Sequence, residues 1–306
     1  MEKIKKAPVY FESENDMKNF VLACEADFES RLDDTISKIE ALNDLKIIAL
    51  SGPTCAGKTT AAKKIISEFE MIGKKVNVIS IDDFYYDREV LHQKAAQKED
   101  VEIDYDSPDT IDLEAISRFV ESIERKEELF CPIFDFNHGE RVGYKRMFCG
   151  EGDVFVFEGI QAVYPEITAL FNNHAYCSVF ISPRSAIEIE DHIILPNELR
   201  LLRRLVRDRI FRSTSAEFTF KIWDSVRKNE EEHIFPYADA CMFNIDSSFA
   251  YEISVLKPYL YATLEDIPQR SGYISKAKEI LDNVSLVPSI SSEFLPNDSL
   301  YWEFVR

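Results

Sequence analysis

The chain has 306 residues, and its 45% hydrophobic content is enough for a sizeable core in one large domain or two small ones. Its formal net charge of −19 argues against nucleic acids and anionic membranes as partners, because such a surface repels their phosphates. The six cysteines are scattered without a C-x-x-C pair, no apolar run is long enough for a membrane helix, and no apolar signal segment follows the basic N-terminus. We therefore expect a cytoplasmic protein with reduced thiols.

The spacing of apolar residues predicts helices alternating with strands. Residues 16–43 carry apolar side chains every three or four positions, which predicts an amphipathic helix, and the apolar run 45–50 predicts a buried strand. Further strands are predicted at 76–83, 153–159, 176–182 and 239–246, with a loop-rich stretch at 84–110. Residues 129–136 and 141–148 predict a hairpin or a pair of extended segments, and residues 197–232 are predicted to be helical and charged. This order predicts an α/β fold with a mostly parallel sheet flanked by helices.

A phosphate-binding pattern follows the first predicted strand. The residues are Gly52, Pro53, Thr54, Cys55, Ala56, Gly57, Lys58 and Thr59, with Thr60 next in the helix. They fit G-x-x-x-x-G-K-[ST], in which backbone N–H groups surround a phosphate, the lysine reaches the outer phosphates and the hydroxyl ligates Mg²⁺. A chance match at a glycine turn is the alternative, and the strand before and helix after the pattern argue against it. The pattern predicts nucleotide binding.

Two carboxylates end apolar strands, Asp82 beside Asp83 and Glu158. In an open parallel sheet the carboxyl ends of the strands line the ligand crevice. A kinase that acts on an alcohol needs a carboxylate near its metal ion and a base for the hydroxyl proton, and Asp82 and Glu158 can share these tasks. The alternative is that either carboxylate caps the next helix or turn.

An arginine-rich helix is predicted between residues 200 and 212. Its members are Arg200, Arg203, Arg204, Arg207, Arg209 and Arg212. Positions 200, 203, 204 and 207 share one helix face, and concentrated guanidinium groups suit a triphosphate. A solvated face paired with the abundant acids is the alternative for any one arginine, and the net charge argues against nucleic-acid contact.

With these residues placed, the chain resembles the uridine kinase and phosphoribulokinase family of P-loop kinases from about residue 45 to 260. The matching stretches occur in the family order and read GPTCAGKTT, SIDDFYYD, YDSPDTID, PIFDFNHGER, VFEGI and RLLRRLVRDRIFR. The resemblance implies a P-loop NTPase fold with a helical lid within about 197–232. It divides the chain into an N-terminal helical extension (1–44), a kinase domain (45–260) and a C-terminal helical extension packed on the core (261–306).

The resemblance also assigns roles to single residues. Lys58 is expected to hold ATP phosphates, Thr59 and Glu158 to bind Mg²⁺ with Asp82 close to the metal, and Asp82 to take the proton of the accepting hydroxyl. The catalytic set comprises Asp82, Lys58, Arg204 and Arg207. The nucleotide set comprises residues 52–60 with Arg207 and Arg212. The acceptor set comprises Tyr85, Asp106, Phe134, His138, Arg141 and Arg204.

Three positions depart from the family pattern. Phe134 stands where the family has a tyrosine that contacts the pyrimidine, His138 is one residue short of the family spacing, and RSTSAE replaces the usual Arg-Gly-Arg after the lid. These changes leave the residues for phosphoryl transfer in place and bear on the acceptor, since a site that no longer hydrogen-bonds the base loses discrimination.

We therefore expect a kinase in pyrimidine salvage that uses ATP or GTP with Mg²⁺ to phosphorylate the 5′-hydroxyl of uridine or cytidine. The alternatives are the same transfer to a non-nucleoside alcohol or sugar phosphate, and a non-catalytic nucleotide-binding regulator. The expected partner is a small-molecule alcohol, and the sequence leaves a homo-oligomer open.

Overall fold

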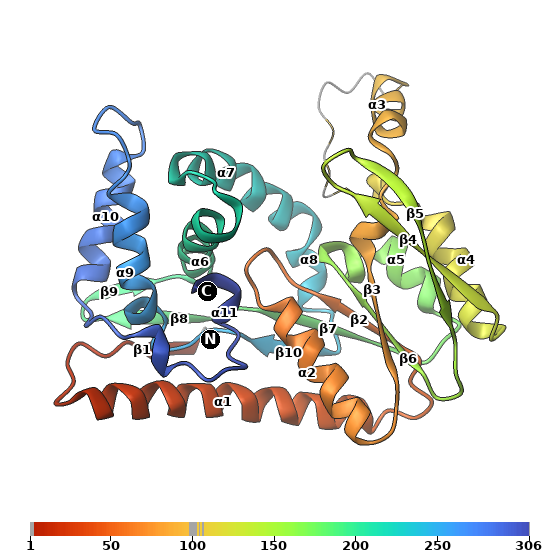
Figure 1. Cartoon of the computed structure of the whole chain (residues 1–306), viewed down its shortest axis with the longest axis horizontal. Coiled ribbons are helices and arrows are strands. Elements are labelled where there is room, and N and C mark those ends of the chain that lie inside the picture. The colour runs from red at the N-terminus through yellow and green to blue at the C-terminus, as the bar shows by residue number, and fades with distance from the viewer. Residues whose placement is uncertain (1–2, 98–102, 104, 106, 306) are drawn as a thin grey trace.

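A computed structural model describes residues 3–97, 103, 105 and 107–305 of the chain (Figure 1). Its helices are α1 (Glu14–Glu40), α2 (Lys58–Met71), α3 (Arg88–Gln97), α4 (Leu113–Glu124), α5 (Pro165–Thr168), α6 (Pro196–Arg212), α7 (Ala216–His233), α8 (Phe235–Ala238), α9 (Glu252–Leu264), α10 (Ile274–Ser285) and α11 (Trp302–Val305). Its strands are β1 (Lys3–Lys6), β2 (Ile47–Ser51), β3 (Val76–Ser80), β4 (Glu128–Asp135), β5 (Glu140–Phe148), β6 (Val154–Glu158), β7 (Tyr176–Ser182), β8 (Ser185–Ile189), β9 (His192–Ile194) and β10 (Phe243–Asp246).

A five-stranded parallel sheet forms the centre of the molecule. Its strand order is β10-β7-β2-β6-β3, with every neighbouring pair parallel. Strand β2 is followed in sequence by β3, yet β6 lies between them in the sheet. The carboxyl ends of β2, β6 and β3 therefore meet at one edge, which is where ligands bind in open α/β sheets. The predicted α/β fold with a mostly parallel sheet is confirmed.

Both faces of the three central strands are largely buried, which explains why β2, β6 and β7 are mostly apolar along their length. Alternate residues of β2 enter two different cores: Ile48 and Leu50 pack with α1, α2, α6 and α9, whereas Ile47 and Ala49 pack with α4 and α5. Helix α1 belongs to the first core, to which it contributes one apolar stripe of Val21, Phe28, Leu32, Ile36 and Ile39. Figure 1 shows α1 running along one side of the molecule below the sheet.

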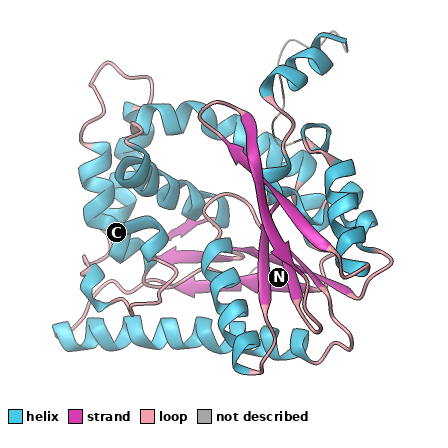
Figure 2. Ribbon diagram, turned by 45° about the vertical axis from the view of Figure 1, so that its right-hand side comes forward, coloured by secondary structure: helices cyan, strands magenta, loops and turns pink. Residues whose placement is uncertain are grey.

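Two smaller sheets accompany the central one. Strands β4 and β5 form the predicted antiparallel hairpin, which Figure 2 shows as a long separate pair of strands. The other sheet has the order β1-β8-β9 and was not predicted. Its first strand pairs with β8, so the N-terminal extension contains a strand as well as the expected helix.

The stretch 197–232, predicted to be helical and charged, consists of two helices with a break between them. Helix α6 ends at Arg212, Ser213 takes a left-handed conformation with φ of 50°, and Ser215 caps α7 by accepting the N–H of Phe218. Two serines and a threonine between the helices favour such a break, since their side chains compete for backbone groups. The stretch 84–110 likewise contains helix α3 where only a loop-rich segment was expected.

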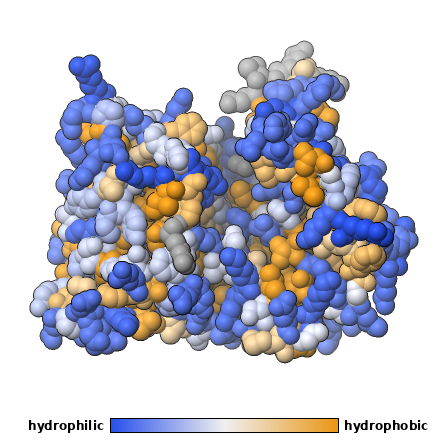
Figure 3. Space-filling model, in the orientation of Figure 1, coloured by the Kyte–Doolittle hydropathy of each residue, from blue (hydrophilic) through white to orange (hydrophobic). Residues whose placement is uncertain are grey.

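The surface is largely polar. Figure 3 shows hydrophilic residues over most of one face, with separate apolar patches and a hollow between the side that carries α7 and the side that carries α3. Among the residues that the structure describes, no helix combines the length and apolar character needed to cross a membrane. All six cysteines are free thiols.

Candidate active site

The loop between β2 and α2 requires both of its glycines. Gly57 has φ of 97°, which disfavours other residues, and a Cβ there would lie 2.2 Å from Cδ1 of Leu300. A Cβ on Gly52 would lie 2.2 Å from the carbonyl oxygen of Ile181 on the neighbouring strand β7. The loop is therefore held close to the sheet on one side and to Leu300 on the other, and it leads directly into the N-terminus of α2.

Lys58 is turned back over this loop. Its Nζ donates to the carbonyl oxygens of Gly52 and Pro53 at 2.7 and 3.2 Å. Burial lowers the pKa of Lys58, and the nearby carboxylates Glu158 and Asp82 act in the opposite direction by favouring its charged form. The structure thus brings the loop lysine within electrostatic reach of the two strand-end carboxylates that the sequence singled out.

Asp82 and Glu158 lie at the same edge of the sheet. Glu158 is the last residue of β6, and it pairs in register with Ser80 of β3 and Leu50 of β2. Asp82 follows β3 in a 3-10 turn that spans Ile81–Phe84. The sequence predicted a strand through residue 83, but the strand ends at Ser80. Because Asp82 and Asp83 lie in the turn that follows, their side chains have different surroundings.

Asp83 faces the hairpin. Its carboxylate accepts the backbone N–H of Phe134 at 3.2 Å, and burial raises its pKa. Asp82, by contrast, lines an open cavity. The two neighbours therefore have different surroundings, with Asp83 fixing the hairpin against the turn and Asp82 facing space that a ligand can enter.

The cavity beside Asp82 has a volume of about 380 Å³ and is mainly aromatic. Tyr85, Phe134 and Phe136 form one cluster in it, with ring centroids 5.2 to 6.5 Å apart. The hydroxyl of Tyr85 donates to the carbonyl oxygen of Tyr105 and accepts from Nε2 of Gln161, both at 2.8 Å. Of the predicted acceptor residues, Tyr85 and Phe134 thus share this cavity with Asp82.

The other predicted acceptor residues lie elsewhere. His138 is exposed and its Nδ1 lies 2.6 Å from Asp135, which raises the pKa of His138. Arg141 pairs with Asp112 at 3.2 Å and lines a separate cavity next to Tyr86. Neither lines the cavity of Asp82, although Gly139 of the same hairpin turn does. Asp106 is outside the described residues.

Three predicted lid arginines gather around one carboxylate, Asp208. Nε of Arg204 donates to it at 3.2 Å, and Nη2 of Arg207 at 2.6 Å. Nε of Arg212 lies 3.9 Å away, and burial together with the charge of Arg207 lowers the pKa of Arg212. Nη1 of Arg207 also donates to the hydroxyl of Thr54 at 3.2 Å, so this cluster adjoins the phosphate loop.

Arg200 and Arg203 have a different position from the one expected. Both are fully buried, Arg200 with Glu230 and Arg203 with Glu252. Their guanidinium groups also donate to loop carbonyls, that of Thr54 at 3.4 Å and that of Cys55 at 3.2 Å. These two arginines lie on the side of α6 that packs on the core, and from there their guanidinium groups hold the loop through its carbonyl oxygens.

Sequence reasoning missed several residues of this region. Gln161, Tyr105 and Phe136 shape the cavity, Asp208 organises the arginines, and Glu303 binds the first turn of α2. Phe136 lies inside a motif already singled out, and an acid within a run of arginines marks Asp208. No pattern in the sequence connects Glu303 with residues some 240 positions earlier, and only the fold does so.

The residues around Lys58 fit a magnesium–nucleotide complex. Thr59 is exposed on the first turn of α2, and Asp82 and Glu158 are half-buried at the sheet edge, so the donor set consists of oxygen atoms alone. Mg²⁺ prefers oxygen ligands and is usually held by one or two carboxylates together with substrate phosphates. Among the described residues, no group of three His, Cys, Asp or Glu side chains is placed to hold a metal ion unaided.

Comparison with known proteins identifies the family. The model of the phosphoribulokinase / uridine kinase family matches residues 47–253. A uridine kinase of Ureaplasma parvum is 27% identical over 58% of this chain and 76% of its own length, and uridine-cytidine kinase B of Dictyostelium discoideum is 25% identical over 62% and 70%. The solved phosphoribulokinase of Rhodobacter spheroides superposes with a TM-score of 0.44 at 16% identity, covering 66% of this chain and 69% of its own.

The family match spans the loop, both strand-end carboxylates and the arginine helix. It agrees with the parallel sheet and the glycine loop described above, and it confirms the resemblance that the sequence motifs indicated. The chain belongs to the phosphoribulokinase and uridine kinase family of ATP-dependent kinases.

Proposed function

We propose that this kinase transfers the terminal phosphoryl group of ATP or GTP to the 5′-hydroxyl of uridine or cytidine. The observation that carries the proposal is the cavity in which Asp82 lies among five aromatic side chains, Tyr85, Tyr86, Tyr105, Phe134 and Phe136. Planar bases stack on aromatic rings. A nucleoside whose base packs on these rings can direct its ribose toward Asp82. The names of the uridine and uridine-cytidine kinases among the relatives support the same substrate class.

In the proposed reaction, Asp82 accepts the proton of the attacking hydroxyl, and catalysis otherwise depends on positioning and charge neutralisation. Lys58 holds the phosphates of the donor, and Arg204, Arg207 and Arg212 offset the charge on the transferring group. Thr59, Asp82 and Glu158 would hold Mg²⁺, which when bound supplies positive charge at the phosphate oxygens. For Lys58 this role requires its Nζ to leave the carbonyls of Gly52 and Pro53, to which it now donates.

A sugar phosphate or another non-nucleoside alcohol is the second candidate acceptor. Two observations favour it: Phe134 presents no hydroxyl to a base, and the guanidinium-bearing Arg88 lines the same cavity. An arginine there can receive a substrate phosphate through paired hydrogen bonds. The predominance of aromatic side chains over cationic ones in the cavity supports the nucleoside.

The test is ADP formation from Mg-ATP with uridine, cytidine, adenosine, ribulose 5-phosphate or no acceptor. We expect turnover with uridine or cytidine, and we expect Asp82→Asn to lower kcat at least ~100-fold, the contribution of a general base. Asp83→Asn is the matched control, since it removes the same charge one residue away and keeps an oxygen for the N–H of Phe134. The kcat of Asp83→Asn should stay within about threefold of the wild-type value, because Asp83 is not the base of the proposed reaction.

Each outcome separates the candidates. Turnover with ribulose 5-phosphate alone would replace the nucleoside by the second candidate. Nucleotide binding without turnover on any acceptor would support a non-catalytic regulator. Equal losses in the two aspartate variants would contradict the assignment of Asp82 as the base, since they would indicate a general disturbance of the turn.

A further inference from the structure

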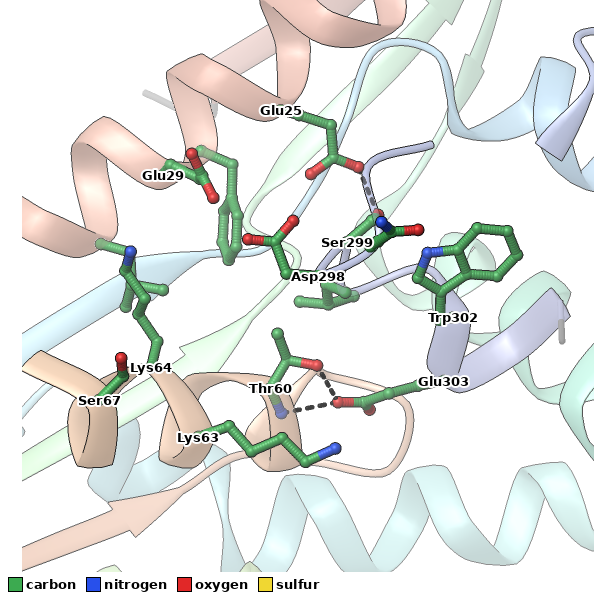
Figure 4. A pocket seen from close by; sticks show the side chains of 14 residues that line it. Glu25, Glu29, Thr60, Lys63, Lys64, Ser67, Asp298, Ser299, Trp302 and Glu303 are labelled. Atoms are coloured by element: carbon green, nitrogen blue, oxygen red, sulfur yellow. Dashed lines mark hydrogen bonds between the residues drawn. The ribbon is translucent and has the colours of Figure 1, made fainter. Parts of the chain in front are cut away.

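A glutamate from the C-terminal part of the chain binds the first turn of the phosphate-loop helix. Oε1 of Glu303 accepts the backbone N–H of Thr60 at 2.8 Å and the hydroxyl of the same residue at 2.6 Å (Figure 4). Both donors belong to the residue that follows the G-x-x-x-x-G-K-[ST] pattern. An anionic group of the protein itself is therefore seated on the loop expected to bind nucleotide phosphates.

The N–H of Thr60 is one of the donors that a helix N-terminus offers to an anion. Helix α2 begins at Lys58, and Ala61 donates to the carbonyl of Gly57 at 3.1 Å. Thr60 comes before that bond, where a helix has no internal acceptor for its N–H groups. The positive end of the helix dipole adds to the attraction, and phosphates bind P-loop helices for these reasons. Glu303 therefore uses a donor that a bound phosphate also uses.

The segment around Glu303, residues 296–305, contacts both the phosphate loop and α1, and we refer to it as the plug. Leu300 and Phe304 of the plug are buried, and Leu300 lies against Gly57 of the loop. The Oγ of Ser299 donates to Glu25 of α1, and Nε1 of Trp302 donates to the carbonyl of Pro296 at 2.6 Å. The plug thus contacts the loop through an apolar residue and a charged one, and it is tied to α1 on its other side.

The charge of Glu303 also acts on the cations of the site. It favours the charged forms of Lys58 and Arg207, both of which are expected to bind donor phosphates. In this structure Lys58 and Arg207 are instead directed to groups of the protein: Lys58 to loop carbonyls, Arg207 to Asp208 and Thr54. Carboxylates of the chain thus supply the negative charge that a nucleotide would bring.

A cavity of about 530 Å³ adjoins this contact, and both Thr60 and Glu303 line it together with residues of α1 and α2. Four carboxylates line it, Glu25, Glu29, Asp298 and Glu303, against the two ammonium groups of Lys63 and Lys64. Figure 4 shows the side chains of all six around this space. The excess of carboxylates over ammonium groups disfavours a polyphosphate in this cavity.

We propose that the plug is an autoinhibitory contact in which the carboxylate of Glu303 and a nucleotide phosphate compete for the N–H and hydroxyl of Thr60. The nucleotide phosphate gains these donors only when Glu303 leaves them. The inference rests on nucleotide binding by the loop, which is part of the proposed function, and it is independent of which alcohol is the acceptor.

The first test measures the Kd of ATP by calorimetry without any acceptor. Glu303→Gln keeps an oxygen for the N–H of Thr60 but removes the competing charge, so we expect ATP to bind about tenfold more tightly, or about 1.4 kcal/mol. Asp298→Asn is the matched control, because it removes one charge from the same cavity without contact to Thr60, and its Kd should remain near that of the wild type. Thermal unfolding of each variant verifies that it is folded.

A Kd for Glu303→Gln that equals or exceeds that of Asp298→Asn would overturn the proposal. Lack of ATP binding in every variant would refute both the competition and nucleotide binding by the loop. Tight ATP binding by Glu303→Gln without turnover on any acceptor would leave the competition standing while the proposed acceptor fails.

A second readout follows the plug itself. The chain has two tryptophans, and Trp223→Phe leaves Trp302 of the plug as the sole tryptophan, which can be excited selectively over tyrosine. Trp302 adjoins Glu303 and lines the same cavity. If ATP displaces Glu303, the surroundings of Trp302 change, and ATP should change its emission with the same Kd that calorimetry gives. ATP binding at that Kd with unchanged emission would show that the plug stays in place, and it would overturn the proposal.

Discussion

At the scale of single residues, Glu25 shows how the surroundings of a carboxyl group determine its protonation. The side chain is buried on α1, where the hydroxyls of Tyr251 and Ser299 donate to it. Burial raises its pKa above the ordinary value of 4.5, and the charges of Glu29 and Asp298 act in the same direction. The two hydrogen bonds oppose this shift without cancelling it.

The raised pKa predicts a pH-dependent stability. Between the unfolded and folded pKa values the folded state binds more protons, so the contribution of Glu25 is fully present below pH 4.5 and falls as the pH rises through the folded pKa. The uncharged Glu25→Gln variant should therefore gain in free energy of unfolding relative to the wild type between pH 4.5 and 7.5. Urea titrations over this range measure the difference.

Glu29→Gln serves as the control, since Glu29 is exposed on the same helix. The difference in free energy of unfolding between Glu29→Gln and the wild type should change less with pH than the difference between Glu25→Gln and the wild type. A Glu25→Gln curve that runs parallel to the wild type across the range would contradict the raised pKa.

At the scale of elements, helix α6 has two kinds of arginine. Arg203 is fully buried and its Nε donates to Glu252 at 2.8 Å, with the aromatic rings of Tyr301 and Phe304 close to its guanidinium. Arg209 is on the exposed side of the same helix and pairs with Asp266 at 2.6 Å. The buried pair fixes α6 to the core.

The contrast predicts different effects of the same substitution. Arg203→Met leaves the carboxylate of Glu252 buried without its cation and should lower the free energy of unfolding by about 3 kcal/mol or more. Arg209→Met breaks a surface pair and should cost about 0–1 kcal/mol. Guanidinium chloride unfolding of both variants is the measurement. Similar losses in the two would mean that solvent reaches the pair of Arg203 and Glu252.

At the scale of the whole molecule, the N-terminal extension is part of the main core. Phe28 of α1 is buried and packs on Phe249 with ring centroids 5.0 Å apart, and Val21 and Leu32 enter the same core. Helix α1 therefore contributes apolar surface to the core beside the central sheet, and we expect the two to unfold together.

Phe28→Ala tests this expectation. It should lower the free energy of unfolding of the whole chain by about 3–5 kcal/mol, because it opens a cavity in the shared core. Leu22→Ala, at an exposed position of the same helix, should change it by less than about 0.5 kcal/mol. Far-UV circular dichroism and tryptophan fluorescence should report one transition in each variant. A separate early loss of helix signal would show that α1 unfolds on its own.

Local patterns predicted most of the fold. The strands of the central sheet, α1 and the hairpin have a regular apolar spacing, and the structure contains them within a few residues of the predicted bounds. The break at Ser213 and the sheet of β1, β8 and β9 were not predicted. Short strands and helix ends depend on contacts with distant segments, and such contacts leave little trace in local spacing.

The sequence by itself determined the phosphate loop, the two strand-end carboxylates and the family. Each of these is recognised from short stretches of neighbouring residues, whose types and spacing are set by the chemistry that they perform. Only the tertiary structure decided which arginines of α6 lie near the loop and which are buried, and that Asp82 rather than Asp83 faces a cavity. It alone brought Glu303 to Thr60. The physical reason is that hydrogen-bond and ion-pair partners are set by proximity in space, and proximity between distant residues arises only when the sheet and its helices have packed.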